Sequence, residues 1–138
     1  MNPFAHRVCL LVLVLSGAFV GVWAYAAPLH WYDNFPGFGM QWLPVLGPYN
    51  EHFAKDVGAL YLALAILSAC AFVRIGNRTL VLVAALSYSA FNLLHFTYHA
   101  TMLHMYGTRD AILNAVSLVV VLLCSMLLLV PAQAGDQA

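Results

Sequence analysis

The chain has 138 residues, of which 64% are hydrophobic and 7% are charged, and its formal net charge is zero. A soluble domain of this length needs far more charged residues to cover its surface, so the composition excludes an ordinary soluble protein. Zero net charge also gives no basis for nucleic acid as a partner. The mean hydropathy is +0.87, and apolar runs long enough to cross a bilayer recur, as in integral membrane proteins.

The first apolar run spans residues 8–27 and predicts a membrane helix. A cleaved signal peptide is the alternative, because Arg7 precedes the run and Ala24-Tyr25-Ala26 resembles a cleavage site. The run is longer than the apolar core of a signal peptide, and the aromatic residues near its end are typical of a membrane interface. We therefore expect this helix to be retained.

Residues 28–55 hold four of the six prolines and three of the nine glycines, which excludes one continuous helix. This segment is predicted to be a long outer loop, rich in aromatic residues and proline, that acts as a lid at the membrane surface. Asn50 is the expected N-cap of the helix that follows. The aromatic side chains expected to reach the headgroup region are Trp31, Phe35, Phe38 and Trp42.

Three further apolar runs predict helices over residues 56–73, 79–103 and 110–130, followed by a polar tail at 131–138. The turns between these helices are short, so successive helices should be antiparallel neighbours. The predicted fold class is all-α: a single integral membrane domain in which four transmembrane helices form a bundle.

The five basic residues predict the orientation of the chain in the membrane. Arg7, Arg74 and Arg78 fall on one side of the predicted bilayer, whereas Lys55 and Arg109 fall on the other. The positive-inside rule then places both termini in the cytoplasm and the aromatic loop outside. We expect a multi-pass protein of the cytoplasmic membrane.

A polar face runs along the third predicted helix. Asn92, His95 and His99 are spaced by three and four residues, and Tyr88 lies one turn earlier on the same face. At a rise of about 1.5 Å per residue, His95 lies roughly 13 Å below His104, near the middle of the bilayer. Polar groups at this depth are costly and often mark a functional site.

The fourth predicted helix carries a matching stripe of Asp110, Asn114 and Ser117, which can face the polar side of the third helix. The second helix opens with polar residues at the same outer level. The candidate ligand-binding residues are Glu51, His52, Asp56, Tyr88, Asn92, His95, His99, Asp110 and Asn114.

Three interpretations of these polar residues compete. They could hydrogen-bond between helices and fix the packing of the bundle. They could hold a metal or haem, with His95, His99 and His52 as the candidate metal ligands. They could line a pocket for an apolar molecule such as a quinone or lipid, with the histidines as polar anchors. No hydrolase or phosphate-binding motif is present, so no catalytic residue is predicted.

The run FPGFGMQWLPVLGPYNEHFAKDVGALYLALA resembles small four-helix membrane proteins common in actinobacteria, of the DoxX-like and DUF4345-like group. Lys55-Asp56 at the start of the second helix and the stretch from His95 to His99 fit that group. The resemblance covers about residues 20–105 and implies a four-helix bundle in the cytoplasmic membrane. Most members have no assigned activity, and some DoxX relatives are linked to quinone-dependent sulfur oxidation. No C-x-x-C pair is present, which argues against thiol–disulfide chemistry.

The leading hypothesis for function is a membrane protein that binds a small molecule or lipid, or an accessory membrane subunit, with an outward-facing polar site. The alternative is a quinone-linked redox protein, or one associated with a metal or haem, that uses His95 and His99. The expected partners are the lipid bilayer, an apolar small molecule or quinone, and a second copy or another membrane subunit.

Overall fold

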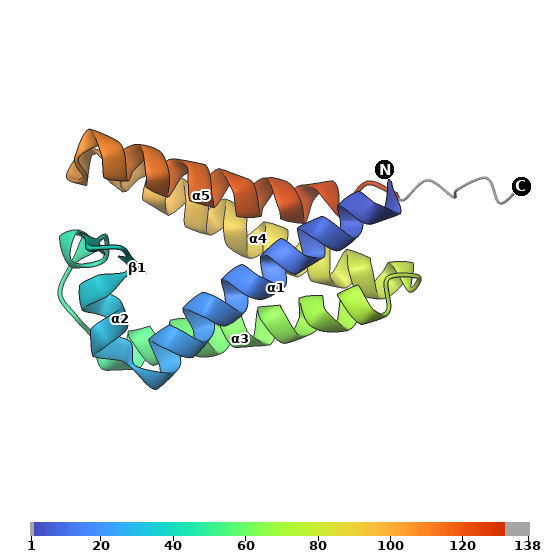
Figure 1. Ribbon diagram of the computed structural model, residues 1–138, viewed down its shortest axis with the longest axis horizontal. Helices are drawn as coiled ribbons and strands as arrows, with labels where there is room; N and C mark the ends of the chain where they lie inside the picture. The colour runs from blue at the N-terminus through green and yellow to red at the C-terminus, as the bar shows by residue number, and fades with distance from the viewer. Residues whose placement is uncertain (1, 132–138) are drawn as a thin grey trace, which may run out of the picture.

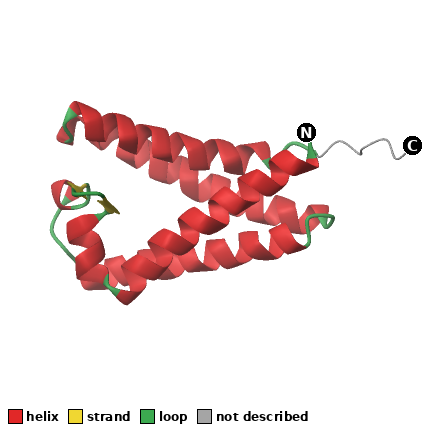
Figure 2. Ribbon diagram, in the orientation of Figure 1, coloured by secondary structure: helices red, strands yellow, loops and turns green. Residues whose placement is uncertain are grey.

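The computed structural model describes residues 2–131, and within them the chain is almost entirely helical (Figure 2). Four of the described helices are long and apolar enough to cross a membrane: α1 (Pro3–Ala26), α3 (Glu51–Val73), α4 (Arg78–Met102) and α5 (Thr108–Leu127). A short 3-10 turn, η2 (Leu103–Met105), follows α4. The prediction of an all-α chain with four such helices is confirmed.

The predicted helix boundaries are wrong by several residues at some ends. Helix α1 begins at Pro3 because Asn2 caps it, and the Asn2 side chain accepts a hydrogen bond from the Phe4 amide. Helix α3 begins at Glu51 because Asn50, the expected N-cap, accepts a hydrogen bond from the Phe53 amide. Helix α5 ends earlier than predicted. The predicted tail at 131–138 lies outside the described residues apart from its first residue.

The long helices form two antiparallel pairs. Helix α1 packs against α3, and α4 packs against α5, while α3 and α1 also contact α4 and α5 respectively. The pairs come together at the closed end, where α1 begins, α3 turns into α4 and α5 ends (Figure 1). At the opposite lid end the two pairs diverge, and the segment between α1 and α3 occupies the space between them.

Glycines allow the close approach of α1 and α3. A Cβ atom at Gly58 would lie 2.7 Å from the Tyr25 backbone nitrogen, and one at Gly21 would lie 2.9 Å from the Leu62 nitrogen. Such contacts require a residue without a side chain, as at small-residue interfaces between membrane helices. Gly17 and Gly21 on α1 have a G-x-x-x-G spacing, and Gly21 lies against Gly58 of α3 while Gly17 lies against Ala65.

At the closed end, side chains from two other helices form hydrogen bonds with the backbone carbonyls that follow α5. The Arg78 guanidinium donates to the carbonyls of Leu128 and Leu129, with a distance of 2.8 Å to Leu128. The His6 ring is also bonded to the Val130 carbonyl at 3.1 Å. The last carbonyls of a helix lack partners within the helix, so these contacts complete its C-terminus and tie α1 and α4 to α5.

The segment between α1 and α3, here called the lid (residues 27–50), is more ordered than the predicted loop. It contains helix α2 (Pro28–Asn34), a two-stranded antiparallel hairpin of β1 (Pro36–Gly37) and β2 (Met40–Gln41), and the 3-10 turn η1 (Pro44–Leu46). Pro36 pairs with Gln41 and Gly37 with Met40. Proline begins α2, β1 and η1, so the prolines that exclude one long helix instead mark the start of short elements.

The expectation that four lid aromatics reach toward headgroups is wrong for Trp31 and Trp42, which are buried within the protein. Phe35 is partly buried between these two rings. Phe38, at the tip of the hairpin, is 96% exposed. The lid therefore turns most of its aromatic surface inward.

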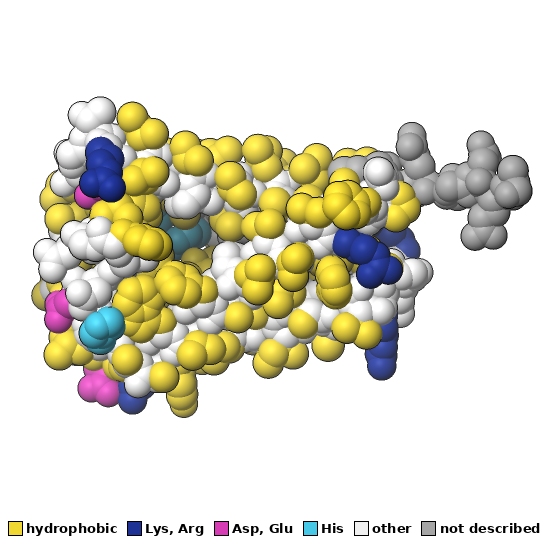
Figure 3. All heavy atoms as spheres, in the orientation of Figure 1, with side chains coloured by type: hydrophobic (Ala, Val, Ile, Leu, Met, Phe, Trp, Pro, Cys, Tyr) yellow, Lys and Arg dark blue, Asp and Glu magenta, His cyan; other side chains and the backbone are white. Residues whose placement is uncertain are grey.

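Apolar side chains cover the visible face of the molecule between its two ends, whereas charged side chains gather at the ends (Figure 3). Large apolar residues are exposed on all four long helices, including Phe19, Leu60, Leu94 and Ile112. A surface of this kind suits contact with hydrocarbon, so the distribution is compatible with a multi-pass membrane protein.

Candidate functional site

A cavity of about 260 Å³ lies between the two helix pairs, under the lid. All four long helices and the lid contribute to its walls, and most of the lining side chains are apolar or aromatic. Pockets for small molecules are usually concave and mainly apolar, with a few polar groups that fix orientation. This cavity is therefore the candidate site, and its polar groups decide what it can bind.

One wall is the polar face of α4, where Tyr88, Asn92, His95 and His99 all line the cavity. The rings of His95 and His99 are in edge contact, with centroids 4.4 Å apart. Phe91 stacks on His95 at 5.2 Å, which extends the row of rings along the helix. The i, i+4 spacing of these side chains is what aligns them on one face.

A second wall comes from α5, which packs beside α4, through Asn114, Ser117, Leu118 and Val121. The Ser117 hydroxyl donates to the Asn114 carbonyl at 2.8 Å, so its hydrogen bond stays within its own helix. Asn114 is buried, with 3% of its surface exposed. Two of the three residues of the predicted polar stripe on α5 thus face the polar side of α4.

Three buried polar atoms around this cavity have no hydrogen-bond partner in residues 2–131: His99 Nδ1, Asn114 Oδ1 and Trp42 Nε1. Their side chains are only 8%, 3% and 6% exposed respectively. Most buried polar groups in proteins are hydrogen-bonded, and leaving one unpaired costs about 1–3 kcal/mol. All three atoms belong to side chains that line this one cavity.

The two deeper polar residues of α4 have partners and join helices. Tyr88 Oη donates to the Leu13 carbonyl of α1 at 2.9 Å. Asn92 Nδ2 donates to the Val121 carbonyl of α5 at 3.0 Å and approaches the Ser125 hydroxyl at 3.4 Å. Hydrogen bonds of this kind fix helix packing inside membranes, so the packing interpretation applies to these two residues.

The lid forms the roof of the cavity through Phe35, Pro36 and Trp42. The Phe35 ring lies 6.0 Å from that of Trp42, and the Trp42 ring lies 6.5 Å from that of Tyr106, between α4 and α5. Tyr106 Oη also donates to the Trp42 carbonyl at 3.0 Å. Burial, with smaller effects of Tyr98 and Asp110, raises the pKa of Tyr106 to about 12, so its hydroxyl keeps the proton that makes this bond.

The cavity opens sideways between α1 and α5. Phe19 and Ser117 line it from these two helices, and both residues are exposed. Figure 3 shows a hollow between the two helices, with a histidine side chain visible at its floor. The opening is therefore on the flank of the molecule, between helices that are long enough to span a membrane.

Four of the predicted site residues do not reach the cavity. His52 and Asp56 are exposed on the first turns of α3, where they pair with each other at 3.4 Å, and Glu51 pairs with Lys55 at 3.1 Å. Asp110 lies in the first turn of α5, where a carboxylate suits the helix dipole. These residues begin helices at the lid end, and their side chains contribute nothing to the cavity wall.

The three predicted metal ligands are not gathered in one place. His95 and His99 are neighbours in the cavity, whereas His52 is exposed and paired with Asp56. Across residues 2–131, no group of three or more His, Cys, Asp or Glu side chains could hold a metal ion. The described part of the chain thus offers a histidine pair without a third such ligand.

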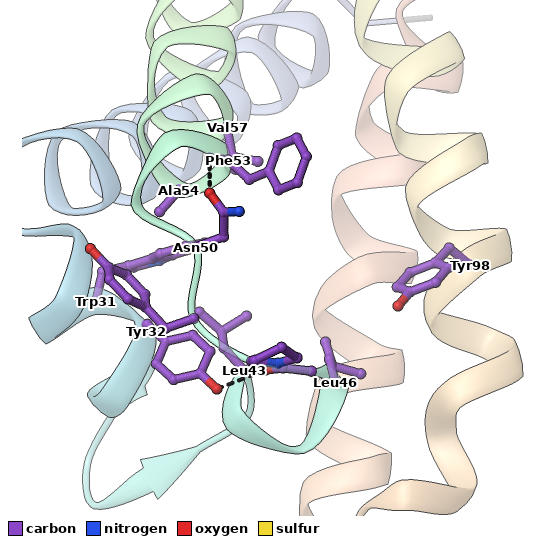
Figure 4. A pocket seen from close by; sticks show the side chains of 12 residues that line it. Trp31, Tyr32, Leu43, Leu46, Asn50, Phe53, Ala54, Val57 and Tyr98 are labelled. Carbon is purple, nitrogen blue, oxygen red and sulfur yellow. Dashed lines mark hydrogen bonds between the residues drawn. The ribbon is translucent and has the colours of Figure 1, made fainter.

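A second hollow, of about 340 Å³, lies on another side of the lid (Figure 4). Leu46 of η1 and Tyr98 of α4 lie on opposite sides of it, and Trp31 and Tyr32 line it from α2. Tyr32 Oη donates to the Gly47 carbonyl at 2.7 Å. None of the predicted site residues lines this groove, and its walls Phe53 and Tyr98 are exposed, so it is a shallower feature than the cavity.

Sequence reasoning missed several residues of the site. Tyr61 on α3 lines the cavity and meets the Phe91 ring at 5.0 Å, and a tyrosine inside an apolar run is a signal that could have identified it. Ser16 on α1 lies inside an apolar run in the same way. The role of Trp42 as a roof could not be read from the sequence, because a tryptophan in a loop between membrane helices equally indicates the membrane interface.

No family model, curated protein or solved structure matches this chain. The resemblance to the DoxX-like and DUF4345-like group therefore stays a prediction.

Proposed function

We propose that this chain is a multi-pass protein of the cytoplasmic membrane whose four long helices form a transmembrane bundle that binds a small, mainly apolar molecule. The bundle would act as a binding protein or as an accessory subunit of a membrane complex. The single observation that carries the proposal is the cavity with its three unpartnered buried polar atoms, on His99, Asn114 and Trp42.

The composition of the walls favours an apolar ligand with one polar end. Burying apolar surface is the main favourable term in binding such a molecule, and about 25 cal/mol is gained for each square ångström removed from water. Within residues 2–131, the lining side chains with a buried, unpartnered polar atom are His99, Asn114 and Trp42, on the outer parts of α4 and α5 and in the roof. A molecule that presents a hydrogen-bonding group there and hydrocarbon elsewhere would match both parts of the lining.

Copurification tests this proposal directly. The protein is extracted into lipid nanodiscs, and small molecules enriched over the surrounding lipid are identified by mass spectrometry. Leu118→Trp should abolish the enrichment, because Leu118 lines the cavity and a tryptophan there fills it. Leu113→Trp places the same ring on the same helix at a residue that is exposed and does not line the cavity.

The control variant should retain whatever the wild-type protein carries. If neither the wild-type protein nor the control enriches any molecule, or if Leu118→Trp leaves the enrichment unchanged, the proposal that this cavity is a binding site is wrong.

The orientation that we propose places both termini in the cytoplasm. The closed end carries three basic residues, Arg7, Arg74 and Arg78, and the lid end carries two, Lys55 and Arg109. The positive-inside rule therefore favours a cytoplasmic closed end by one basic residue. A fluorescent protein fused to the C-terminus should fold and fluoresce, whereas an alkaline phosphatase fused there should be inactive. An active phosphatase fusion and a non-fluorescent fluorescent-protein fusion would show that the C-terminus lies outside, and the proposed orientation would be wrong.

The alternative proposal is a quinone-linked redox protein, or one associated with a metal or haem. It is favoured by one observation, the close contact of the His95 and His99 rings in the cavity. Elemental analysis and the visible absorption of the purified protein test it, and His95→Ala and His99→Ala should then each abolish the signal. A colourless, metal-free preparation that binds no quinone would contradict it.

The apolar exposed faces of the long helices also support association with a second copy or with another membrane subunit. We expect crosslinking in membranes, rather than in detergent, to detect such a partner.

A further inference from the structure

The opening of the cavity lies deep along the helices that form it. Phe19 is seven residues before the end of α1 at Ala26, and Ser117 is nine residues after the start of α5 at Thr108. At about 1.5 Å per residue, the opening is roughly 10–14 Å inside the lid ends of these helices. The hydrocarbon core of a bilayer is about 30 Å thick, so the opening faces hydrocarbon near the middle of the membrane.

The lid closes the other route, from the aqueous side. Phe35 and Trp42 cover the cavity, and the hydrogen bond from Tyr106 to the Trp42 carbonyl joins this roof to the turn between α4 and α5. A molecule dissolved in water would have to displace this aromatic layer. A molecule dissolved in the bilayer can reach the cavity through the gap between α1 and α5.

The polar groups restrict the chemistry of the occupant. No Lys, Arg, Asp or Glu is among the described residues that line the cavity, so a charged end would be buried without one of these side chains as a counter-ion. The Trp42 indole N–H can only donate a hydrogen bond, whereas Asn114 Oδ1 can only accept one. A hydroxyl group both accepts and donates, but an ether or a ketone only accepts.

We infer that the cavity binds a neutral amphiphile, a hydrocarbon chain that ends in a hydroxyl group, and that this molecule enters sideways from the bilayer between α1 and α5. This inference rests on the proposed function and adds to it the class of ligand and the route. The hydroxyl accepts from Trp42 and donates to Asn114, and the chain lies against the apolar walls toward the opening between Phe19 and Ser117.

The test uses the full chain in phosphatidylcholine nanodiscs and four photoreactive probes with the same diazirine-bearing alkyl chain. Their ends are a primary alcohol, its methyl ether, a methyl ketone and a carboxylate. Labelled residues are mapped by mass spectrometry, and the probe concentration that gives half-maximal labelling of the cavity is measured. We expect the alcohol probe to give half-maximal labelling at about one-tenth of the concentration that the ether probe needs. This difference corresponds to one additional buried hydrogen bond.

Two variants separate the roles of the polar groups. Asn114→Leu should remove the preference for the alcohol over the ether while the ether still labels the cavity. Trp42→Phe should weaken labelling by the alcohol probe and by the ether probe by the same factor, because each probe has an oxygen that can accept a hydrogen bond from the indole. A structural role for Asn114 would instead weaken labelling by both probes equally, and that result would overturn its assignment.

The route is tested by blocking the opening. Ser117→Trp should strongly slow or abolish labelling of the cavity, whereas Val116→Trp adds the same ring at the preceding exposed residue, which does not line the cavity. Equal labelling rates in Ser117→Trp and wild type would show that the ligand does not enter between α1 and α5.

The outcomes distinguish the inference from the function on which it rests. If none of the four probes labels residues that line the cavity, the proposed function itself fails. If the ether, the ketone or the carboxylate labels the cavity as well as the alcohol or better, a binding site exists but the hydroxyl is not its determinant, and the inference is wrong.

Discussion

The polar face of α4 behaves differently in its two halves. In the half nearer the closed end, Tyr88 and Asn92 donate to backbone carbonyls of α1 and α5, and the helices are held together. In the half nearer the lid, His99 lines the same cavity as Asn114 of α5, and a ring nitrogen of His99 and the amide oxygen of Asn114 have no partner within residues 2–131. Polar residues on the same helix therefore differ in their surroundings. Those near the closed end bond to neighbouring helices, whereas those near the lid line the cavity that forms where the helix pairs diverge.

The two halves contribute differently to the stability of the fold. Buried hydrogen bonds between helices contribute about 1 kcal/mol each, so the deeper half supports the fold. Unpartnered buried groups destabilise the protein but leave hydrogen-bonding capacity for a ligand. Substitutions in the two halves should consequently have effects of opposite sign on stability.

The largest effect is expected from Gly17→Leu. A Cβ atom at Gly17 would collide with the Tyr88 hydroxyl and lie 3.2 Å from Ala65 Cβ, so a leucine would push Tyr88 from its bond to Leu13 and separate α1 from α3. We expect a loss of about 3 kcal/mol or more, or no folded protein, measured by thermal unfolding in mild detergent. Ala90→Leu, on the exposed face of α4, should have little effect.

The next effect tests the deeper half by itself. Asn92→Leu removes the donor to Val121 and leaves that carbonyl and the Ser125 hydroxyl with one partner fewer, so the free energy of unfolding should fall by about 1–3 kcal/mol. Thermal unfolding measures it. An unchanged unfolding midpoint would mean that the hydrogen bonds of Asn92 do not stabilise the fold, in contrast to what we expect for Tyr88.

In the half nearer the lid, Asn114→Leu should leave the free energy of unfolding unchanged or raise it by about 1 kcal/mol, because it removes a buried oxygen that has no partner among the described residues. The same unfolding assay is used in parallel with Asn92→Leu. A loss of stability equal to that of Asn92→Leu would remove the distinction between the two halves.

The smallest effect on global stability is expected from Tyr106→Phe, which removes the hydrogen bond between the turn after α4 and the lid. The unfolding midpoint should change little, but limited proteolysis at neutral pH should cut the lid faster than in wild type. Tyr98→Phe is the matched control, because Tyr98 is exposed and makes no hydrogen bond to the lid in the described structure. Equal proteolysis of both variants would mean that this bond does not hold the roof.

The same residue gives a pH prediction. Burial raises the pKa of Tyr106 to about 12, so the unfolded chain releases this proton first, near pH 10. Its contribution to stability is therefore present below pH 10 and declines as pH rises from there to about 12. Titration of tyrosinate absorbance should show one residue that ionises near 12 in wild type and not in Tyr106→Phe.

The helical class and most of one wall of the cavity can be predicted from the amino-acid sequence. Long apolar runs can satisfy their backbone groups in a bilayer only as helices or closed barrels, and their length is set by the membrane, so four helices followed from composition. The spacing of Tyr88, Asn92, His95 and His99 placed them on one face, because helical periodicity is local.

Which polar groups come together depends on the packing of the helices and cannot be predicted from the sequence. Glu51, His52 and Asp56 were equally plausible from their position along the chain, but their side chains are exposed at the start of α3. Trp42 roofs the cavity because the lid folds back between the diverging helix pairs, which depends on contacts between residues far apart in the sequence. Whether a buried polar atom has a hydrogen-bond partner likewise depends on those contacts, and the spacing of residues in the sequence does not predict it.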